Sequence, residues 1–143
     1  MRLTLHTDYA LRALIFLARA DSQTATAGEI AAAYGVSRNH LVKVLQGLRD
    51  QGHVETSRGR HGGVRLAVDP QQLRLGDVVR QTEPLIELVE CFNPQTNTCP
   101  LSRVCRLKRV LAEALSAYLE VLDAYTLADV TANGAELDAL LGR

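Results

Sequence analysis

The chain has 143 residues, of which 47% are hydrophobic, and its 16 Lys and Arg side chains balance 16 Asp and Glu side chains. This length and composition fit one globular domain, or a small domain with an appendage, that buries a real core. No apolar run approaches the roughly 20 residues of a membrane helix, and the first residues lack the apolar core of a signal peptide, so we expect a cytoplasmic protein with no membrane partner.

The first expected helix begins near Thr7 and Asp8. Apolar side chains then recur at helical spacing, at Ala10, Ala13, Leu14 and Leu17. Asp8 puts a carboxylate at the positive end of this helix, where acidic groups are favourable. An ordinary helix cap is one interpretation of Asp8.

A helix-turn-helix motif is expected next. Thr26 and Glu29 have the spacing of a capping box, and Gly35 suits the positive φ of a tight turn. Ser37 then caps a second helix, whose buried stripe is Leu41, Val44, Leu45 and Leu48. The opposite face of that helix presents the hydrogen-bonding side chains of Arg38, Asn39, His40 and Lys43. This arrangement is typical of a recognition helix that enters the major groove of DNA.

Two short strands with a basic, glycine-rich tip follow, at Val54 and Thr56 and at Val64, Leu66 and Val68. Residues 36–66 carry six Lys or Arg and two acids, whereas residues 111–143 carry six acids and one base. The strand pair could be a solvated hairpin, but directly after a helix-turn-helix it predicts a DNA-binding wing. The candidate DNA-contacting residues are Ser37, Arg38, Asn39, His40, Lys43, Arg58, Arg60 and His61.

The three cysteines, Cys91, Cys99 and Cys105, are separated by seven and five residues. Asparagines and prolines in this stretch predict a loop. Three reduced thiols favour a metal centre or a reactive thiol over a disulfide framework. Structural zinc sites use shorter spacings and four ligands, whereas iron-sulfur clusters tolerate irregular spacing. His6 and Asp8 are the leading candidates for a fourth ligand, and a carboxylate is the weaker, more exchangeable partner for iron.

A short helix is expected from Leu75 to Gln81, and a long one follows the cysteine loop. Its apolar residues repeat every three or four positions for about five turns, at Val104, Leu107, Leu111, Leu115, Tyr118 and Leu122. A core helix is possible, but so regular a stripe predicts pairing with a second copy of the chain. A homodimer would bind a near-palindromic operator. Thr126 is expected to cap a last short helix through Val130, and the chain after Gly134 to be loosely held.

These elements predict a mainly α fold with a small β wing, a winged helix-turn-helix, plus a long C-terminal dimerisation helix. The expected parts are a DNA-binding domain over 1–82, a cluster-binding loop over 83–106, and the dimerisation helix with its tail over 107–143. No nucleophile–base motif or phosphate-binding loop is recognisable, so we do not expect an enzyme. A [2Fe-2S] centre, bare reactive thiols, and an iron-sulfur enzyme subunit or electron carrier are the alternatives.

Several stretches resemble one known family. They are residues 1–14, the recognition helix at 35–43, the wing at 58–66, Leu75 to Arg80, the three cysteines, and Tyr125 to Asp129. The chain is similar to the dimeric iron-sulfur winged-helix regulators of the NsrR/IscR type, and within them to the nitric-oxide-sensing branch. Lys108 stands where the IscR branch carries a histidine ligand, and the first cysteine gap is longer than is usual in the family.

The resemblance implies a transcriptional repressor that senses nitric oxide. It implies a [4Fe-4S] cluster held by three cysteines and by a carboxylate from the partner subunit, positions that map onto Cys91, Cys99, Cys105 and Asp8. Nitrosylation of the cluster would abolish binding to double-stranded operator DNA. We expect Asp8 to connect the cluster of one subunit to the DNA-binding half of the other.

Overall fold

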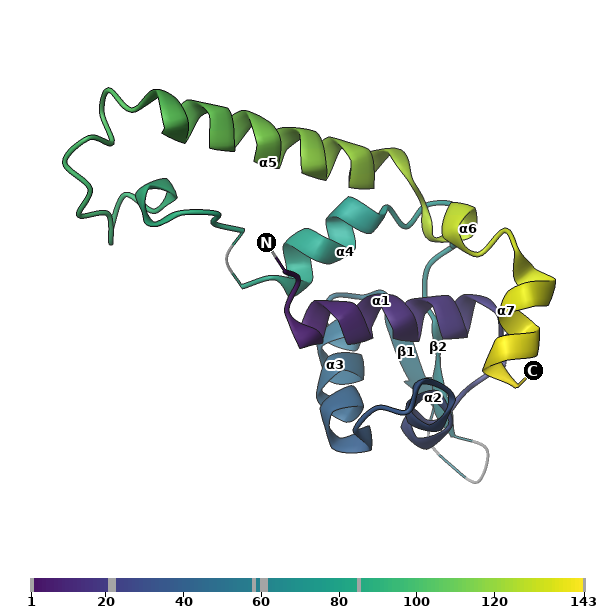
Figure 1. The fold of residues 1–143 in the computed structure, drawn as a ribbon. Coiled ribbons are helices and arrows are strands. Elements are labelled where there is room, and N and C mark those ends of the chain that lie inside the picture. Colours follow the sequence, from purple (N-terminus) through teal and green to yellow (C-terminus); the bar gives the residue numbers. More distant parts are fainter. Residues whose placement is uncertain (1, 21–22, 58, 60–61, 85, 143) are drawn as a thin grey trace.

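A computed structural model of the chain describes residues 2–20, 23–57, 59, 62–84 and 86–142. Its elements, in chain order, are α1 (Leu5–Ala18), α2 (Ala27–Tyr34), α3 (Arg38–Asp50), β1 (Val54–Ser57), β2 (Gly63–Leu66), α4 (Leu75–Thr82), the 3₁₀ helix η1 (Glu90–Phe92), α5 (Arg106–Ala124), α6 (Leu127–Val130) and α7 (Gly134–Leu141). Helices dominate, and β1 and β2 form a two-stranded sheet (Figure 1). The predicted mainly α winged helix-turn-helix with a long C-terminal helix is confirmed.

Helix α1 is the centre of the domain and contacts α2, α3, α4, α6 and β2. Ala10, Ala13 and Leu14 of α1 are completely buried. The two alanines leave room for neighbouring helices to approach the α1 backbone closely, and Leu14 fills the space between them. Most of the core therefore lies in the N-terminal half of the chain, where α3 packs against α1.

The start of α1 differs from the prediction, which put it at Thr7 and Asp8. The N-cap is Thr4, whose hydroxyl accepts a hydrogen bond from the backbone N–H of Thr7 at 3.3 Å. The carboxylate of Glu83, at the end of α4, accepts hydrogen bonds from the backbone N–H of Thr4 at 2.8 Å and from its hydroxyl at 3.1 Å. The helix begins one turn earlier than predicted because this distant carboxylate fixes its cap.

The helix-turn-helix follows the local signals of the sequence. Thr26 and Glu29 form the capping box of α2, and Gly35 takes a φ of 62° in the turn after α2. Such a positive φ is easily adopted by glycine and strained for other residues. The Ser37 hydroxyl accepts a hydrogen bond from the backbone N–H of His40 at 3.4 Å, which confirms Ser37 as the cap of α3. The predicted buried stripe is also confirmed, with Leu41, Val44, Leu45 and Leu48 all buried.

The wing is an antiparallel pair in which Val54 lies opposite Leu66 and Glu55 lies opposite Arg65. Glu55 and Arg65 form an ion pair across the strands at 2.6 Å. A single bridge from Ala25 to β2 attaches the sheet to the connection between α1 and α2. The prediction that the second strand continues to Val68 is wrong, because β2 ends at Leu66 and the chain then bends.

Helix α5 and the cysteine loop before it extend away from the domain (Figure 1), and we call residues 86–124 the arm. The C-terminal end of α5 is held by α4, where both guanidinium Nη atoms of Arg80 bond the carboxylate of Asp123 at 2.6 and 2.5 Å. This contact attaches the arm to the domain at the C-terminal end of α5.

Within the described ranges, no helix is both long enough and apolar enough to cross a membrane.

The end of the chain packs back onto the domain. Thr126 and Asp129 form a capping box for α6, which confirms the predicted short helix through Val130. The expectation of a loosely held tail after Gly134 is wrong, because α7 forms there. Arg19, which follows α1, bonds both carboxylate oxygens of Asp138 at 3.0 and 2.7 Å and holds α7 in place.

Candidate DNA interface and metal centre

The exposed face of α3 carries most of the candidate DNA-contacting side chains. Arg38, Asn39 and Lys43 are exposed there, and Ser37 is exposed at the cap. His40 lies at the side of α3 that faces α1, with its ring edge-on to Tyr9 at 5.9 Å between centroids. Because residues three and four apart share a helix face, Asn39 and Lys43 form one polar ridge that can reach into a groove.

The wing lies beside α3, and its candidate residues Arg58, Arg60 and His61 fall outside the described residues. At the base of the tip, the backbone N–H of Gly63 donates to the Ser57 hydroxyl at 3.3 Å. Helix α3 packs against β1 of the wing. The contribution of the three tip residues to DNA binding stays a prediction.

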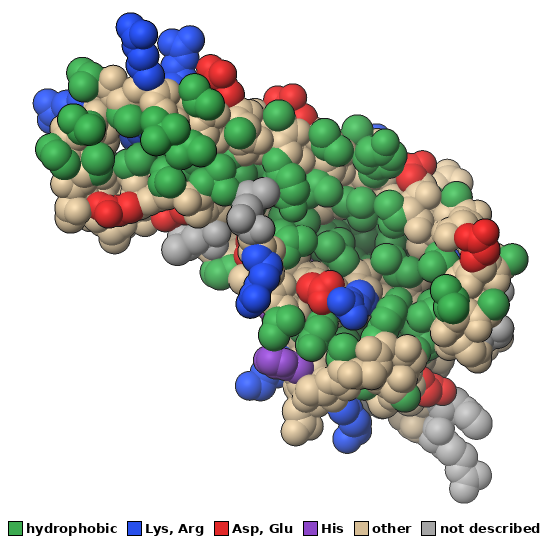
Figure 2. All heavy atoms as spheres, in the orientation of Figure 1, with side chains coloured by type: hydrophobic (Ala, Val, Ile, Leu, Met, Phe, Trp, Pro, Cys, Tyr) green, Lys and Arg blue, Asp and Glu red, His purple; other side chains and the backbone are tan. Residues whose placement is uncertain are grey.

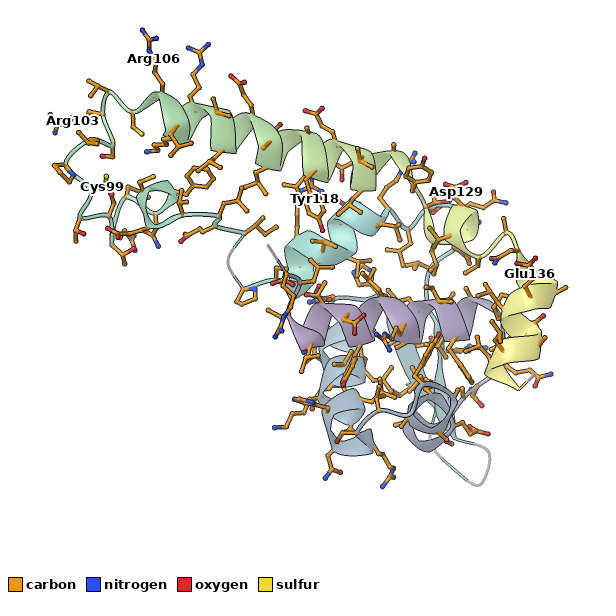
Figure 3. All side chains as sticks on the ribbon, in the orientation of Figure 1. Cys99, Arg103, Arg106, Tyr118, Asp129 and Glu136 are labelled. Atoms are coloured by element: carbon orange, nitrogen blue, oxygen red, sulfur yellow. The ribbon has the colours of Figure 1, made fainter. Side chains whose placement is uncertain are left out.

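The three cysteines lie in and beside the loop of the arm that precedes α5. Cys91 is in η1, Cys99 is in an irregular segment, and Cys105 is the N-cap of α5. All three are free thiols of intermediate exposure. Figure 3 places Cys99 and Arg103 near the far end of the arm, away from α1. The segment was predicted to contain no helix. The structure differs at Cys91, which lies in the short 3₁₀ helix η1.

The long first gap between cysteines is closed by a hydrogen bond pair. The carboxylate of Glu90 accepts from the backbone N–H of Thr98 at 2.5 Å and from its hydroxyl at 2.7 Å. These bonds from Thr98 hold the pKa of Glu90 below its ordinary value. Glu90 and Thr98 directly precede Cys91 and Cys99, so the pair joins the backbone at the two cysteines despite the seven residues between them.

Cys105 occupies the positive end of α5. Its sulfur accepts a hydrogen bond from the backbone N–H of Lys108 at 3.4 Å. Four basic side chains lie in the same turn and the loop before it: Arg103, Arg106, Lys108 and Arg109. A helix N-terminus and nearby bases favour negative charge, which suits a group held by several thiolates.

The donor set fits an iron-sulfur cluster in its chemistry. Across the part of the chain that is described, no three His, Cys, Asp or Glu side chains lie close enough together to hold a metal ion. Thiolates are the usual ligands of such clusters, and three free thiols on one segment supply three of four positions.

Asp8 faces a basic partner within its own helix. Its carboxylate bonds Arg12 at 2.8 and 3.0 Å, and the side chain is 37% exposed. The guanidinium of Arg12 also lies 5.9 Å from the ring centroid of Tyr34, the last residue of α2. Burial raises the pKa of Tyr34, and the charge of Arg12 opposes that rise. Arg12 therefore connects Asp8 to the residue just before the turn of the helix-turn-helix.

The rest of the first turn of α1 contacts α3 and α4. His6, the other candidate ligand, lies beside Gly47 of α3, where a Cβ would meet its Nε2 at 3.5 Å. Burial by itself would raise the pKa of Glu83, but hydrogen bonds from Thr7 and Thr4 hold it below its ordinary value. The first turn of α1 therefore contacts both α3 and the end of α4.

Sequence reasoning missed the residues that act through distant partners. Glu90, Glu83 and Arg12 carry no motif, and their partners Thr98, Thr4 and Tyr34 lie eight, 79 and 22 residues away. The spacing of Asp8 and Arg12 was the one available signal, because an i,i+4 pair of opposite charges interacts on a helix.

Comparisons with known proteins agree with this architecture. A model of the Rrf2 family, described as an iron-dependent transcriptional regulator, matches residues 3–133. The HTH-type transcriptional regulator NsrR of Halalkalibacterium halodurans is 52% identical over 99% of this chain and 97% of its own. The protein of the same name from Bacillus subtilis is 50% identical, with the same coverage of both chains.

Solved structures with the same fold include two regulators. IscR of T. potens aligns with a TM-score of 0.76 and 25% identity over 94% of this chain and 88% of its own. CymR, the global cysteine regulator of B. subtilis, aligns with a TM-score of 0.74 and 26% identity over 93% and 98%. These regulators are not enzymes, as predicted for this chain. The chain belongs to the Rrf2 family of iron-dependent transcriptional regulators.

Proposed function

We propose that this regulator is a nitric-oxide-sensing repressor that binds a near-palindromic operator as a homodimer and leaves it when its [4Fe-4S] cluster is nitrosylated. The observation that carries the proposal is the set of three free thiols on one exposed segment of a chain whose helix-turn-helix is complete. The half-identical relatives named NsrR and the iron-dependent family support it.

Cys91, Cys99 and Cys105 would hold the cluster, and Asp8 from the partner subunit would supply the fourth ligand. When bound, the cluster supplies iron that reacts with nitric oxide. The Glu90–Thr98 hydrogen bonds join the residues that precede the first two cysteines, and the positive N-terminal end of α5 would offset the negative charge of the thiolates. The three cysteines thus supply three of the four ligands, and the fourth is a carboxylate from outside the loop.

The exposed stripe of α5 supports a dimer. Leu107, Val110 and Val121 are 64, 58 and 58% exposed, and the exposed Ala114 lies between them on the same face. Their spacing of three, four and seven residues is that of a helix seam. Part of the stripe predicted from the sequence has another role, because Leu115 borders a hollow between α5 and residues 86–92, and Tyr118 points from α5 toward α4 (Figure 3).

Figure 2 shows hydrophobic side chains spread along the arm and over the hollow between the arm and the domain. An apolar helix face this long is rarely left in water by a chain that functions as a monomer. A second copy is the occupant we infer, because its own arm presents the same stripe and a two-fold axis makes such a surface self-complementary.

Asp8 has two possible partners in this proposal. As a ligand it would leave Arg12, and on release it would return to the pairing seen here, at 2.8 Å. Because Arg12 lies against Tyr34, a change at Asp8 alters the contact that supports the turn before α3. The recognition helices of a dimer would then change spacing, and binding to two half-sites would weaken.

The test begins with protein prepared without air. Iron and sulfide analysis and native mass should give four of each per chain, and Cys99→Ser should lose them. A mass that fits [2Fe-2S], or a colourless protein whose thiols alone respond, would support the alternative regulator instead. Retention of operator DNA by a protein free of iron and sulfide, with release on adding nitric oxide, would contradict the proposal.

The Asp8→Ala variant tests the coupling. It should still bind iron and sulfide, yet require a different amount of nitric oxide for release from a duplex operator, measured by anisotropy. Glu120→Ala is the matched control, because Glu120 is an exposed carboxylate that accepts an i,i+4 hydrogen bond from Ser116 at 3.1 Å, farther along α5. An unchanged response in Asp8→Ala would remove Asp8 from the mechanism.

A further inference from the structure

The outward face of α3 carries one large apolar side chain among polar ones. Val42 is 44% exposed, and it is the exposed large hydrophobic residue of α3 in the described structure. It lies three residues after Asn39 and four before Gln46, so the three side chains share one face of the helix. This face adjoins the polar ridge of Asn39 and Lys43.

The surroundings of Val42 are open and partly apolar. A shallow hollow between α3 and the wing is lined by Val42 together with Ala27, Leu45, Gln46, Arg49, Thr56 and Val64. Lys43 and Gln46 beside it are exposed and polar. An apolar group of a bound molecule can therefore contact Val42 in this hollow without displacing any core residue.

Two neighbouring side chains are already engaged elsewhere. The ring of His40 lies against Tyr9 of α1, and Arg49 bonds Asp50 at 2.8 Å. Among the described residues, none covers Val42, which remains 44% exposed. The apolar surface it offers is complementary to the C5-methyl group of thymine, the one apolar group on the base edges of the major groove.

We propose that Val42 determines operator specificity by contacting a thymine C5-methyl in each half-site, with Asn39 and Gln46 hydrogen-bonding to the base edges on either side of it. This inference rests on the proposed function, because it requires that α3 enter the major groove of an operator. It adds a residue that selects the sequence to those that provide charge and hydrogen bonds. Burial against a methyl needs no ion pair, so this contact is insensitive to salt, unlike contacts to phosphate.

The test uses uracil in place of thymine, because deoxyuridine lacks only the C5-methyl. A duplex operator is first selected from random DNA with the air-protected full-length protein, and each thymine of one half-site is then replaced in turn. At one position the wild-type protein should bind roughly fourfold more weakly, the loss expected for one methyl group of about 0.8 kcal/mol.

The Val42→Ala variant completes the cycle. It should bind the thymine duplex more weakly by a similar factor and should not distinguish uracil from thymine at the sensitive position. Leu140→Ala is the matched control, because Leu140 is an exposed apolar residue of α7, 83% accessible and far along the chain from α3. It should retain the wild-type preference.

Three outcomes would overturn the inference. The first is that uracil changes the binding affinity at no position. The second is that uracil weakens DNA binding by Val42→Ala and by wild type equally. Either result removes Val42 from methyl recognition while leaving the repressor function intact. If selection enriches no duplex at all, sequence-specific binding itself fails, and the proposed function falls with the inference. Circular dichroism of Val42→Ala and Leu140→Ala establishes that both variants are folded.

Discussion

Replacing Val110 by Glu on the exposed stripe of α5 should separate the two subunits. Val110 is 58% exposed in the single chain, and complete burial of a valine contributes about 1.5–3 kcal/mol. Covering the exposed part in a dimer is therefore worth about 1 kcal/mol per subunit, or about 2 kcal/mol for the symmetric pair. The substitution removes this contribution.

The new carboxylate adds a penalty. An unpaired polar group buried at an interface costs about 1–3 kcal/mol, and a charge costs more. The combined loss is on the order of 4 kcal/mol for the dimer, which raises its dissociation constant roughly 10³-fold, since 1.4 kcal/mol corresponds to a factor of ten. Sedimentation equilibrium over a wide concentration range measures this constant directly.

Ala112→Glu is the control for added charge. Ala112 lies two residues from Val110, about 200° around the helix, and borders the hollow between α5 and residues 86–92. It should leave the dimer intact. Equal dissociation constants for wild type, Val110→Glu and Ala112→Glu would refute the assignment of this stripe to the subunit interface, as would a wild-type protein that sediments as a monomer at micromolar concentration.

Three further predictions concern the junction that holds the arm. Leu127→Ala should lower the free energy of unfolding by about 2–5 kcal/mol in urea titrations, because Leu127 is 1% exposed and its loss leaves a cavity. Gly76→Ala should change the free energy of unfolding by less than about 1 kcal/mol in the same measurement, because the new Cβ displaces only the exposed Asp123 carboxylate from Arg80 while alanine favours the helix by a similar amount. Hydrogen bonds from the backbone N–H and the hydroxyl of Thr126 hold the pKa of Asp129 below its ordinary value of about 4. The ionised carboxylate therefore stabilises the fold above that ordinary pKa, and this stabilisation is lost as the pH falls through the lowered pKa. Asp129→Asn should lower the free energy of unfolding at pH 7 and should become increasingly indistinguishable from wild type in acid.

The local elements of this protein could be predicted from its sequence. The capping boxes at Thr26 and Thr126, the glycine turn at Gly35 and the cap at Ser37 all depend on residues within a few positions, so the fold has little freedom to alter them. The same is true of the buried stripe of α3, whose apolar spacing defines one face of a helix. The close spacing of three cysteines likewise predicted the segment that carries the candidate centre.

Contacts between distant residues decided the remainder. Glu83 sets the start of α1 from 79 residues away, and Arg19 holds α7 from 119 residues away. The packing of α5 against α4 and residues 86–92 selects which stripe of that helix stays exposed, whereas periodicity showed only that the helix had an apolar side.

The candidate site divides in the same way. Its residue types could be read from the sequence, but the hydrogen bond from Thr98 to Glu90 and the position of Arg12 between Asp8 and Tyr34 exist only in the folded chain. The physical reason is that helix caps and turns are stabilised by neighbours along the backbone, whereas ion pairs and packing between elements require the whole core to bring their partners together.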